Sequence, residues 1–378
     1  MTEEQIPFVT LTNGNLGRQH MPKDYSISVA TYYRGGTDRF LLNPKKQRVQ
    51  PMKGFEEQYN DIIDYIVRIT HSIWEECNVG LIYDYYRHNS RVMDDYAVIH
   101  GRETVVENTI KSINAFPDAR GYADEIIWAG DEEVGFHTSH RAVIVAHNTG
   151  FSQYGPPTNK KVSYWVIADC LSLENEIYEE WVLYNTTAVI QQLGLDVFQL
   201  AREISPPIGL RAMKDPRSGD PPRLPGLGKP PVLPPYKGEK FDVEDFVRRT
   251  FHDIWNWRLV GKVNDYYVPN VLFHGTGNRE FHGVGQLRSY FMSVLAMFPN
   301  LAHQIDHIYW MGNDQEGYRV SVRWSIEGSH RGPGLYGKPT GKPISMWGIS
   351  QLEIRGGKIL EEWTLFNEFA VIQQILVD

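Results

Sequence analysis

The sequence lacks the features that mark secreted, membrane-spanning and nucleic-acid-binding proteins. Its 378 residues hold only two cysteines, Cys77 and Cys170, too few for a disulfide framework and not spaced as metal ligands. No apolar run approaches the roughly 20 residues of a membrane helix, and residues 1–5 do not resemble a signal peptide. The net charge of -8, with no offsetting run of Lys or Arg, opposes nucleic-acid binding. We therefore expect a cytoplasmic protein with free thiols and neither nucleic acid nor membrane as a partner.

What the chain does contain is an internal repeat. The motif Phe-Pro-Asp at residues 116–118 returns as Phe-Pro-Asn at 298–300, and Glu-Glu-Trp at 179–181 returns at 361–363. Both recurrences are 182 residues apart, whereas Asp-Tyr-Tyr at 84–86 returns 181 residues later. One residue was therefore gained or lost near residues 88–98. Such a shared offset predicts two copies of one domain in tandem.

The repeat divides the chain into four segments. Residues 1–53 match nothing in the second copy, and we expect an N-terminal arm there with a strand at residues 25–30. Residues 54–200 and 241–378 are the two copies, each long enough to bury its own core. Between them, residues 201–240 carry four Pro-Pro pairs, which disfavour helix and central strand and predict an extended, semi-rigid linker.

Each copy shows helical patterns first and strand patterns afterwards. Apolar residues at helical spacing open both copies, and shorter helices are expected at residues 104–114 and 286–297. Alternation then predicts strands: Phe136, Thr138 and His140 share one face, while His137 and Ser139 share the other. Further strands are expected at 162–170 and 177–184, matched by 344–352 and 359–366. This order predicts an α+β fold in which a curved antiparallel sheet closes over helices as a cone with a cavity.

Several motifs of the second copy together resemble the SnoaL-like polyketide cyclase family of the NTF2-like superfamily. They are Gly-Ser-His-Arg-Gly at 328–332, Tyr-Gly-Lys-Pro-Thr-Gly-Lys at 336–342, Gly-Lys-Ile-Leu-Glu-Glu-Trp at 357–363, and Gln-Gln at 373–374. The first copy carries a looser version, so the resemblance covers about residues 55–196 and 242–376. It implies two tandem NTF2-like cone-shaped α+β barrels and cofactor-independent acid/base chemistry on a hydrophobic small molecule. Because this fold hosts many reactions and also non-enzymes, the resemblance does not fix the reaction.

One departure from the family pattern concerns a residue four positions after the tryptophan of Glu-Glu-Trp. Several family members carry an acidic residue near this place, whereas this chain has Asn185 and Asn367. An amide cannot act as a general acid or base near neutral pH, although it can orient a carbonyl or enolate oxygen.

Cofactor-free proton transfer needs a side chain of tunable pKa in a partly dry cavity. His140 is the most informative candidate, because its neighbours on the same face are apolar and its counterpart in the second copy is Val322. The alternative is a core histidine that is hydrogen-bonded to a neighbour. Asp94 and Asp95 are further candidates, expected at the place where the second copy has His274, and the alternative for them is a turn aspartate.

Asp169 shares a strand face with Ile167, and burial among apolar neighbours would raise its pKa into the range of a general acid or base. Its counterpart is Gln351. In the second copy the catalytic candidates are His274 and His330, with His282 and Arg323 behind them. The candidates for substrate binding are Tyr164, Trp165, Asn185, Arg323, Trp347 and Asn367.

Two glutamates that occur in both copies are expected to have structural roles. Glu180 and Glu362 stand at equivalent positions in both copies, and we expect them to pair with Arg141 and Arg323 on neighbouring strands. No metal site is expected, since His137 and His140 point to opposite faces of one strand. The chain also has no phosphate-binding loop and no nucleophile elbow, and no cofactor is expected.

The leading functional hypothesis is a cofactor-independent lyase or isomerase, including aldol-type cyclisation or carbon–carbon cleavage, acting on an aromatic or polyketide-like molecule. A second hypothesis is hydration, dehydration or epoxide hydrolysis in the same cavity. A third is a non-catalytic binding or assembly module, in which the two copies pair sheet against sheet as a pseudo-dimer, with or without further oligomerisation. The cavities discriminate between an enzyme and a binding module, because side chains that fill the cavities of both copies would exclude an enzyme.

Overall fold

The computed structural model describes residues 48, 50–204, 233, 235–238 and 240–376. The strand expected at residues 25–30 and most of the predicted Pro-rich linker lie outside these described residues. Within them, no helix combines the length and apolar character that crossing a membrane requires.

Domain 1 begins with helices and continues as a sheet, as the pattern predicts. The first long helix starts after Asp61, whose carboxylate caps it by accepting a hydrogen bond from the backbone N–H of Asp64. The elements are α4 (Ile62–Thr70), η1 (His71–Glu75), η2 (Val79–Leu81), α5 (Ile82–Tyr85), β1 (Tyr86–Met93), β2 (Val98–His100), α6 (Arg102–Ala115), β3 (Arg120–Asp131), β4 (Gly135–His147), β5 (Lys161–Leu173), β6 (Glu176–Tyr184), α7 (Thr186–Gln192) and α8 (Val197–Glu203).

Domain 2 repeats this order, which confirms the duplication. Asp242 caps its first helix through the N–H of Asp245, as Asp61 does in domain 1. The elements are α10 (Val243–Phe251), η3 (His252–Asn256), η4 (Val260–Lys262), α11 (Val263–Tyr266), β7 (Tyr267–Gly275), η5 (Thr276–Asn278), β8 (Arg279–His282), α12 (Gly283–Met297), β9 (Ala302–Asn313), β10 (Gly317–Ser329), β11 (Pro343–Arg355), β12 (Lys358–Phe366) and α13 (Glu368–Leu376).

The two sheets have the same topology, with strand orders β2-β1-β6-β5-β4-β3 and β8-β7-β12-β11-β10-β9. The α+β class is confirmed. The expectation of a wholly antiparallel sheet is wrong for one pair in each domain, since β1 runs parallel to β6 and β7 runs parallel to β12. Strands β3 to β6 are joined by hairpins, which force antiparallel pairing. No hairpin joins β1 to β6, so alternation of residue types does not reveal the direction of that pair.

The repeat extends to the conformation of single turns. Gly130 and Gly312 both lie in the left-handed region, with φ of 100° and 99°. A Cβ atom at either position would lie 2.1 Å from the carbonyl oxygen of Gly135 or Gly317, respectively. Only glycine fits such a close approach of two backbones, which explains why this residue stands at the same place in both β-hairpins.

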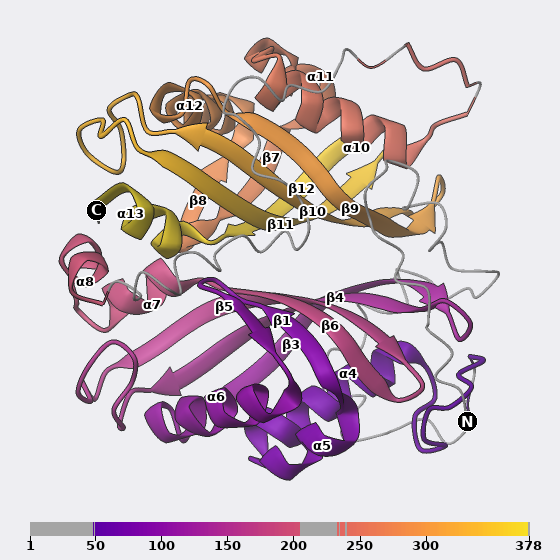
Figure 1. The fold of residues 1–378 in the computed structure, drawn as a ribbon. Coiled ribbons are helices and arrows are strands. Elements are labelled where there is room, and N and C mark those ends of the chain that lie inside the picture. The colour runs from indigo at the N-terminus through magenta and orange to yellow at the C-terminus, as the bar shows by residue number, and fades with distance from the viewer. Residues whose placement is uncertain (1–47, 49, 205–232, 234, 239, 377–378) are drawn as a thin grey trace.

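The two sheets pack against each other, and the helices α4 to α6 and α10 to α12 lie on the outer sides (Figure 1). An apolar cluster joins the facing sides of the sheets, with Trp165, Ile167 and Leu183 from domain 1 and Trp347, Ile349 and Leu365 from domain 2. Two cation–π contacts cross the interface in a pseudo-symmetric way. Arg141 lies 3.9 Å from the ring centre of Trp363, and Arg323 lies 3.4 Å from that of Trp181. Each sheet therefore has one face toward its own helices and one toward the other domain.

Candidate functional site

The face that each sheet turns toward its own helices lines the interior of the domain. In domain 1, His140 of β4 lies between Ile126 of β3 and Ala168 of β5. In domain 2, Val322 takes the same place between Ile308 and Ser350. The equivalence of His140 and Val322 is thus confirmed by strand register.

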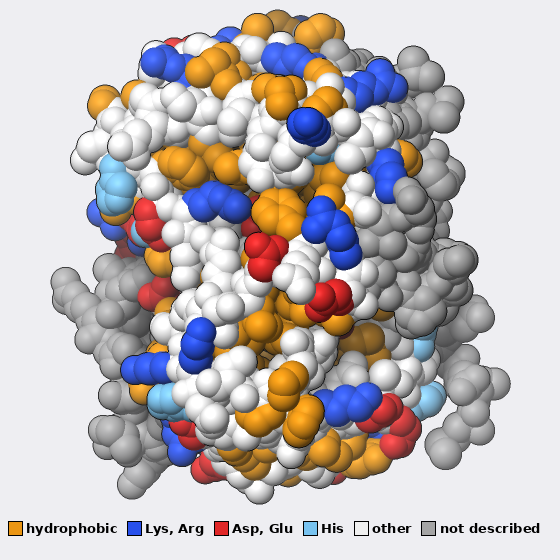
Figure 2. Space-filling view, turned by 90° about the vertical axis from the view of Figure 1, so that its left-hand side faces the viewer, with side chains coloured by type: hydrophobic (Ala, Val, Ile, Leu, Met, Phe, Trp, Pro, Cys, Tyr) orange, Lys and Arg blue, Asp and Glu red, His pale blue; other side chains and the backbone are white. Residues whose placement is uncertain are grey.

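The interior face of the sheet is more accessible to solvent in domain 1 than in domain 2. Along β5 the interior-facing Tyr164, Val166 and Ala168 are half-buried, although the interface-facing residues between them are buried. At the end of β6, Tyr184 has 40% of its surface exposed, while its counterpart Phe366 has 6%. Figure 2 shows a hollow with hydrophobic walls in the lower half of the molecule, which is domain 1.

His140 presents an uncommitted polar atom to the interior of domain 1. Its side chain is 6% exposed, and Nε2 forms no hydrogen bond with any described residue. Burial lowers the pKa of His140 to about 4, because desolvation disfavours the imidazolium. The ring is therefore neutral at pH 7, and it can donate or accept one hydrogen bond at Nε2 in the appropriate tautomer.

Glu180 of β6 also faces this interior. Its Oε2 accepts a hydrogen bond of 2.8 Å from the hydroxyl of Tyr86, and burial raises the pKa of Glu180 to about 7. The expected pairing with Arg141 is wrong, because Arg141 lies on the opposite face of the sheet and bonds Asp124. The repeat showed that both copies have a glutamate at this position, but it could not show that Arg141 lies on the opposite face of the sheet.

The equivalent carboxylate in domain 2 accepts a hydrogen bond at each of its two oxygen atoms. Glu362 accepts from the Tyr267 hydroxyl at 2.7 Å and from the Thr364 hydroxyl at 2.8 Å, so its expected pairing with Arg323 is also wrong. The counterpart of Thr364 in domain 1 is Val182, which has no hydroxyl. Among the described residues, Glu180 Oε1 consequently has no hydrogen-bond donor, and it remains available to a ligand.

Domain 2 closes its interior with one large side chain. The indole of Trp324 lies over Gly348, where a Cβ atom would come within 2.2 Å of the ring. Its Nε1 donates to the hydroxyl of Ser350 at 3.0 Å, which in turn bonds Thr364 at 2.7 Å. Domain 1 has small or apolar side chains at the four equivalent positions, namely Ala142, Val166, Ala168 and Val182. The same fold therefore encloses an open site in one copy and a packed core in the other.

Domain 2 also buries a histidine that the sequence analysis did not single out. His303 of β9 stacks on Trp255 at a ring distance of 6.3 Å and lies 5.4 Å from Trp324. Burial lowers the pKa of His303 to about 3. Its Nε2 makes no hydrogen bond to the described residues, but the ring is enclosed by aromatic side chains and is only 3% exposed. Its position is glycine in domain 1, Gly121, so the repeat gave no signal for it.

Asp94 and Asp95 lie where β1 ends in domain 1. Asp94 holds a turn, since its Oδ1 accepts from the N–H groups of Tyr96 and Ala97 at 2.7 and 2.8 Å. Asp95 is buried and accepts a short hydrogen bond from the hydroxyl of Thr186. Burial raises the pKa of both carboxyl groups. Asp95 Oδ1 has no hydrogen-bond partner in the described part of the chain.

The expected equivalence of these aspartates with His274 is wrong. In strand register, His274 pairs with Trp363 exactly as Met93 pairs with Trp181, so His274 corresponds to Met93. Its ring stacks on Trp363 at 3.7 Å and lies 2.9 Å from Glu361 and 2.5 Å from Glu280. His274 thus lies on the face of the sheet that turns toward domain 1, as Trp363 does, and away from the interior of domain 2.

The remaining candidates of the second copy hold loops and strand ends. His330 follows β10, where its backbone N–H donates to Lys342 O and its Nδ1 lies 3.3 Å from the Thr340 hydroxyl. Asn367 accepts the N–H of Trp347 at 3.0 Å. Asn185 of domain 1 crosses to domain 2, where it accepts the N–H of Gly277 at 2.7 Å.

Four further candidates lie between the two sheets. Asp169 shares the face of Ile167 as expected, and burial raises its pKa, but this face is the domain interface. Its oxygens accept from Tyr309 at 2.7 Å and from Arg323 at 3.3 Å. Trp165 and Trp347 belong to the apolar cluster that joins the sheets. The structure thus brings His140 and Tyr164 to the interior of domain 1, together with Glu180, which the sequence analysis had considered structural.

The buried glutamates predict a pH dependence of stability. Burial raises the pKa of Glu362 to about 7 from 4.5, so between these values the folded state binds more protons than the unfolded state. The free energy of unfolding must then fall as pH rises through this window. Replacing Glu362 with Gln removes this term, on the order of 3 kcal/mol. Urea unfolding of both proteins between pH 5 and 8, in steps of about one pH unit, should therefore give a flatter profile for Glu362→Gln; parallel profiles would contradict the assignment.

Comparisons with known proteins agree with the resemblance seen in the sequence. Residues 245–375 match the family model described as SnoaL-like polyketide cyclase. This match covers domain 2, and it supports an activity of the cyclase or isomerase type for the chain as a whole. A search of curated protein sequences returned no match.

Solved structures similar to this chain correspond in length to one domain. A candidate SnoaL-like polyketide cyclase from Jannaschia sp. CCS1 is 18% identical over 37% of this chain and 99% of its own, with a TM-score of 0.33. IdmH from Streptomyces antibioticus, a candidate polyketide cyclase, is 18% identical over 35% and 97%, with a TM-score of 0.30. A protein of ketosteroid isomerase-like fold from Catenulispora acidiphila is 15% identical over 35% and 92%, with a TM-score of 0.29.

Proposed function

We propose that domain 1 is a cofactor-independent enzyme that moves protons on a hydrophobic, enolisable carbonyl compound, and that domain 2 is its non-catalytic partner. The observation that carries the proposal is the contrast between the two interiors. In domain 1, His140 Nε2 is buried and forms no hydrogen bond with the described residues, and Glu180 accepts the Tyr86 hydroxyl at Oε2 rather than at Oε1. At the same positions, domain 2 has Val322 and Glu362, and both carboxylate oxygens of Glu362 accept hydrogen bonds.

The two open polar atoms have complementary chemistry. Glu180, with a pKa of about 7, is ionised in a large fraction of molecules near neutral pH and is a strong enough base to accept a proton from carbon. His140 is neutral and can donate from Nε2 to an oxygen that becomes negative. A base and an oxyanion donor on one interior face are what enolisation requires.

In the proposed reaction, Glu180 Oε1 removes the proton from the carbon next to a carbonyl group. The electron pair of the broken C–H bond forms the enolate, and His140 stabilises the enolate oxygen by a hydrogen bond. The enolate carbon then attacks a second carbonyl carbon of the same molecule, which closes a ring and leaves an alkoxide, and Glu180 returns the proton to the alkoxide oxygen. In an unsaturated carbonyl compound, Glu180 instead returns the proton to a different carbon, which moves the carbon–carbon double bond. No oxidant, reductant or cofactor is consumed in either case.

The surroundings favour an aromatic or polyketide-like substrate. Tyr164 and Tyr184 offer half-exposed or exposed rings on the same side of the sheet. Because Ile126 is fully buried, the apolar surface offered to a ligand comes from the half-buried Val166 and Ala168. Such walls suit a flat, hydrophobic molecule with a few oxygen atoms. We propose that domain 2 supports this site by packing sheet against sheet, as half of a pseudo-dimer within one chain.

A simple enolisable probe tests the proposal. With 2-tetralone in D2O, the protein should accelerate exchange of the α-protons, followed by NMR. The exchange rate should rise with pH and level off above about 8, because Glu180 must be ionised. Glu180→Gln should remove both the acceleration and this pH dependence.

Glu362→Gln is the matched control, since it makes the same change in the closed interior of domain 2. It should exchange the probe at the wild-type rate. The proposal fails if the wild-type protein gives no acceleration with the probe bound, or if the two variants behave alike.

A further inference from the structure

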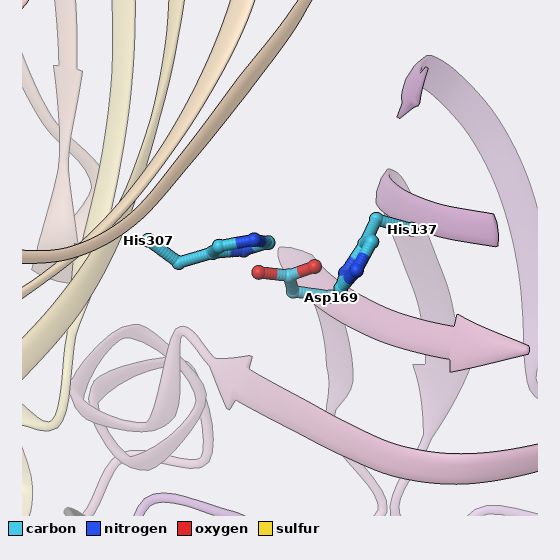
Figure 3. Close-up of side chains that lie close together, drawn as sticks. All are labelled: His137, Asp169 and His307. Atoms are coloured by element: carbon cyan, nitrogen blue, oxygen red, sulfur yellow. The ribbon is translucent and has the colours of Figure 1, made fainter. Parts of the chain in front are cut away.

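Three buried side chains of ligand type meet between the two domains, on the side of the sheets opposite to the proposed site. They are His137 of β4, Asp169 of β5 and His307 of β9 (Figure 3). Each offers one nitrogen or oxygen atom, and these atoms lie within 4.8 Å of one another. The three side chains are 5%, 1% and 2% exposed, so the cluster lies inside the interface rather than on the surface.

The pseudo-symmetric positions across the interface show that the fold does not require this set. There, Arg319 replaces His137, Glu125 replaces His307 and Gln351 replaces Asp169. Arg319 and Glu125 form an ion pair of 3.3 Å, and Gln351 donates to the backbone and hydroxyl oxygens of Ser139. One set of pseudo-symmetric positions in the interface thus holds an ion pair and an amide. The other set holds three residues of types that can coordinate transition metals.

We propose that His137, Asp169 and His307 bind one Zn²⁺ ion, which links domain 1 to domain 2. Two imidazoles and one carboxylate are a donor set that zinc accepts, with bonds of about 2.0–2.2 Å. Tetrahedral zinc would bring neighbouring ligand atoms to about 3.4 Å, so closure needs side-chain movements of about 1 Å. Mg²⁺ and Ca²⁺ prefer sites made of oxygen atoms and fit this set poorly.

Two neighbours of Asp169 determine how strong the site is. The Tyr309 hydroxyl, 2.7 Å from Oδ1, fixes the orientation of the carboxylate in the way that hydrogen bonds support metal ligands. The Arg323 guanidinium, 3.3 Å from Oδ2, adds a positive charge that repels a dication. Zinc binding at this site is therefore weaker than that of a site with the same ligands and no arginine.

Metal binding to the whole chain tests the proposal. After treatment with a chelator and equilibrium dialysis against Zn²⁺, the wild-type protein should hold one zinc ion per chain that a double variant lacks. The double variant is His137→Arg with His307→Glu, which installs the ion pair that the chain itself uses at the pseudo-symmetric positions and should therefore fold. Zinc should raise the Tm of the wild-type protein and not that of the double variant, because an ion that binds only the folded state stabilises it.

Two further variants sharpen the test. His140→Val removes the buried histidine on the opposite face of β4, and it should bind zinc as the wild type does. Arg323→Gln keeps a hydrogen-bond donor to Asp169 but removes the charge, and it should bind zinc about tenfold more tightly. Equal zinc content and equal Tm shift in the wild type and the double variant would overturn the site, as would the absence of any zinc in the wild type.

Discussion

A double variant that installs the packing of domain 2 in domain 1 should abolish activity without unfolding the protein. Ala142→Trp combined with Val166→Gly places an indole over a glycine at the positions where the chain already has Trp324 over Gly348. Because the register of β4 and β5 equals that of β10 and β11, the ring has a template for its orientation. It should fill the interior next to His140 and exclude the substrate.

We expect exchange of the 2-tetralone probe to fall by at least about 100-fold, which is the loss of one well-placed catalytic contact. Circular dichroism and the unfolding transition should show a folded protein. Single Ala142→Trp is not equivalent, because Val166 would clash with the ring, and overpacking costs about 1–3 kcal/mol.

The matched control lies in domain 2. Trp324→Phe loses the hydrogen bond to Ser350 and leaves that hydroxyl with fewer partners, so stability should fall by about 1–3 kcal/mol. The exchange rate should remain that of the wild type, because the change is far from the open interior. If the domain 1 double variant kept full activity, or if Trp324→Phe lost it, the assignment of the two domains would be reversed.

His140→Val should separate a catalytic histidine from a core histidine. The variant places in domain 1 the residue found at the same position in domain 2. If His140 donates a hydrogen bond to the enolate oxygen, the exchange rate should fall by about 10²–10³-fold. Stability should hold or rise by about 1 kcal/mol, since the change removes a buried polar atom that has no partner. A merely structural histidine would give the stability change without the loss of rate.

The reverse change, Val322→His in domain 2, is its control. It places a polar ring in a packed interior, so we expect a loss of stability of about 1–3 kcal/mol and no change in the exchange rate. Wild-type exchange by His140→Val, measured on a protein shown to be folded, would remove His140 from the mechanism.

Much of the fold could be predicted from the chain alone because it carries its own comparison. The 182-residue offset aligned His140 with Val322 and Asp169 with Gln351, and strand register supports both pairs. Alternation also separated His137 from His140, which lie on opposite faces of β4. These features are local or repeated, so sequence patterns contain them.

What the sequence could not show is which face of each strand lines the interior. Both faces of β4 are largely buried, one by the domain's own helices and one by the other sheet, so apolar neighbours surround Asp169 and His140 alike. Asp169 and Arg323 were therefore grouped with the site although they lie in the interface. Asp94 and Asp95 were also matched with His274, although the 181-residue offset of the preceding segment places His274 opposite Met93.

The central claim is that one chain has one open interior, in domain 1. Isothermal titration with 2-naphthol, a flat phenolic molecule that suits apolar walls with a few polar atoms, measures this directly. The account predicts one binding site per chain in the wild-type protein and none in the double variant Ala142→Trp with Val166→Gly. Two sites per chain, or one site that survives in that variant, would contradict it.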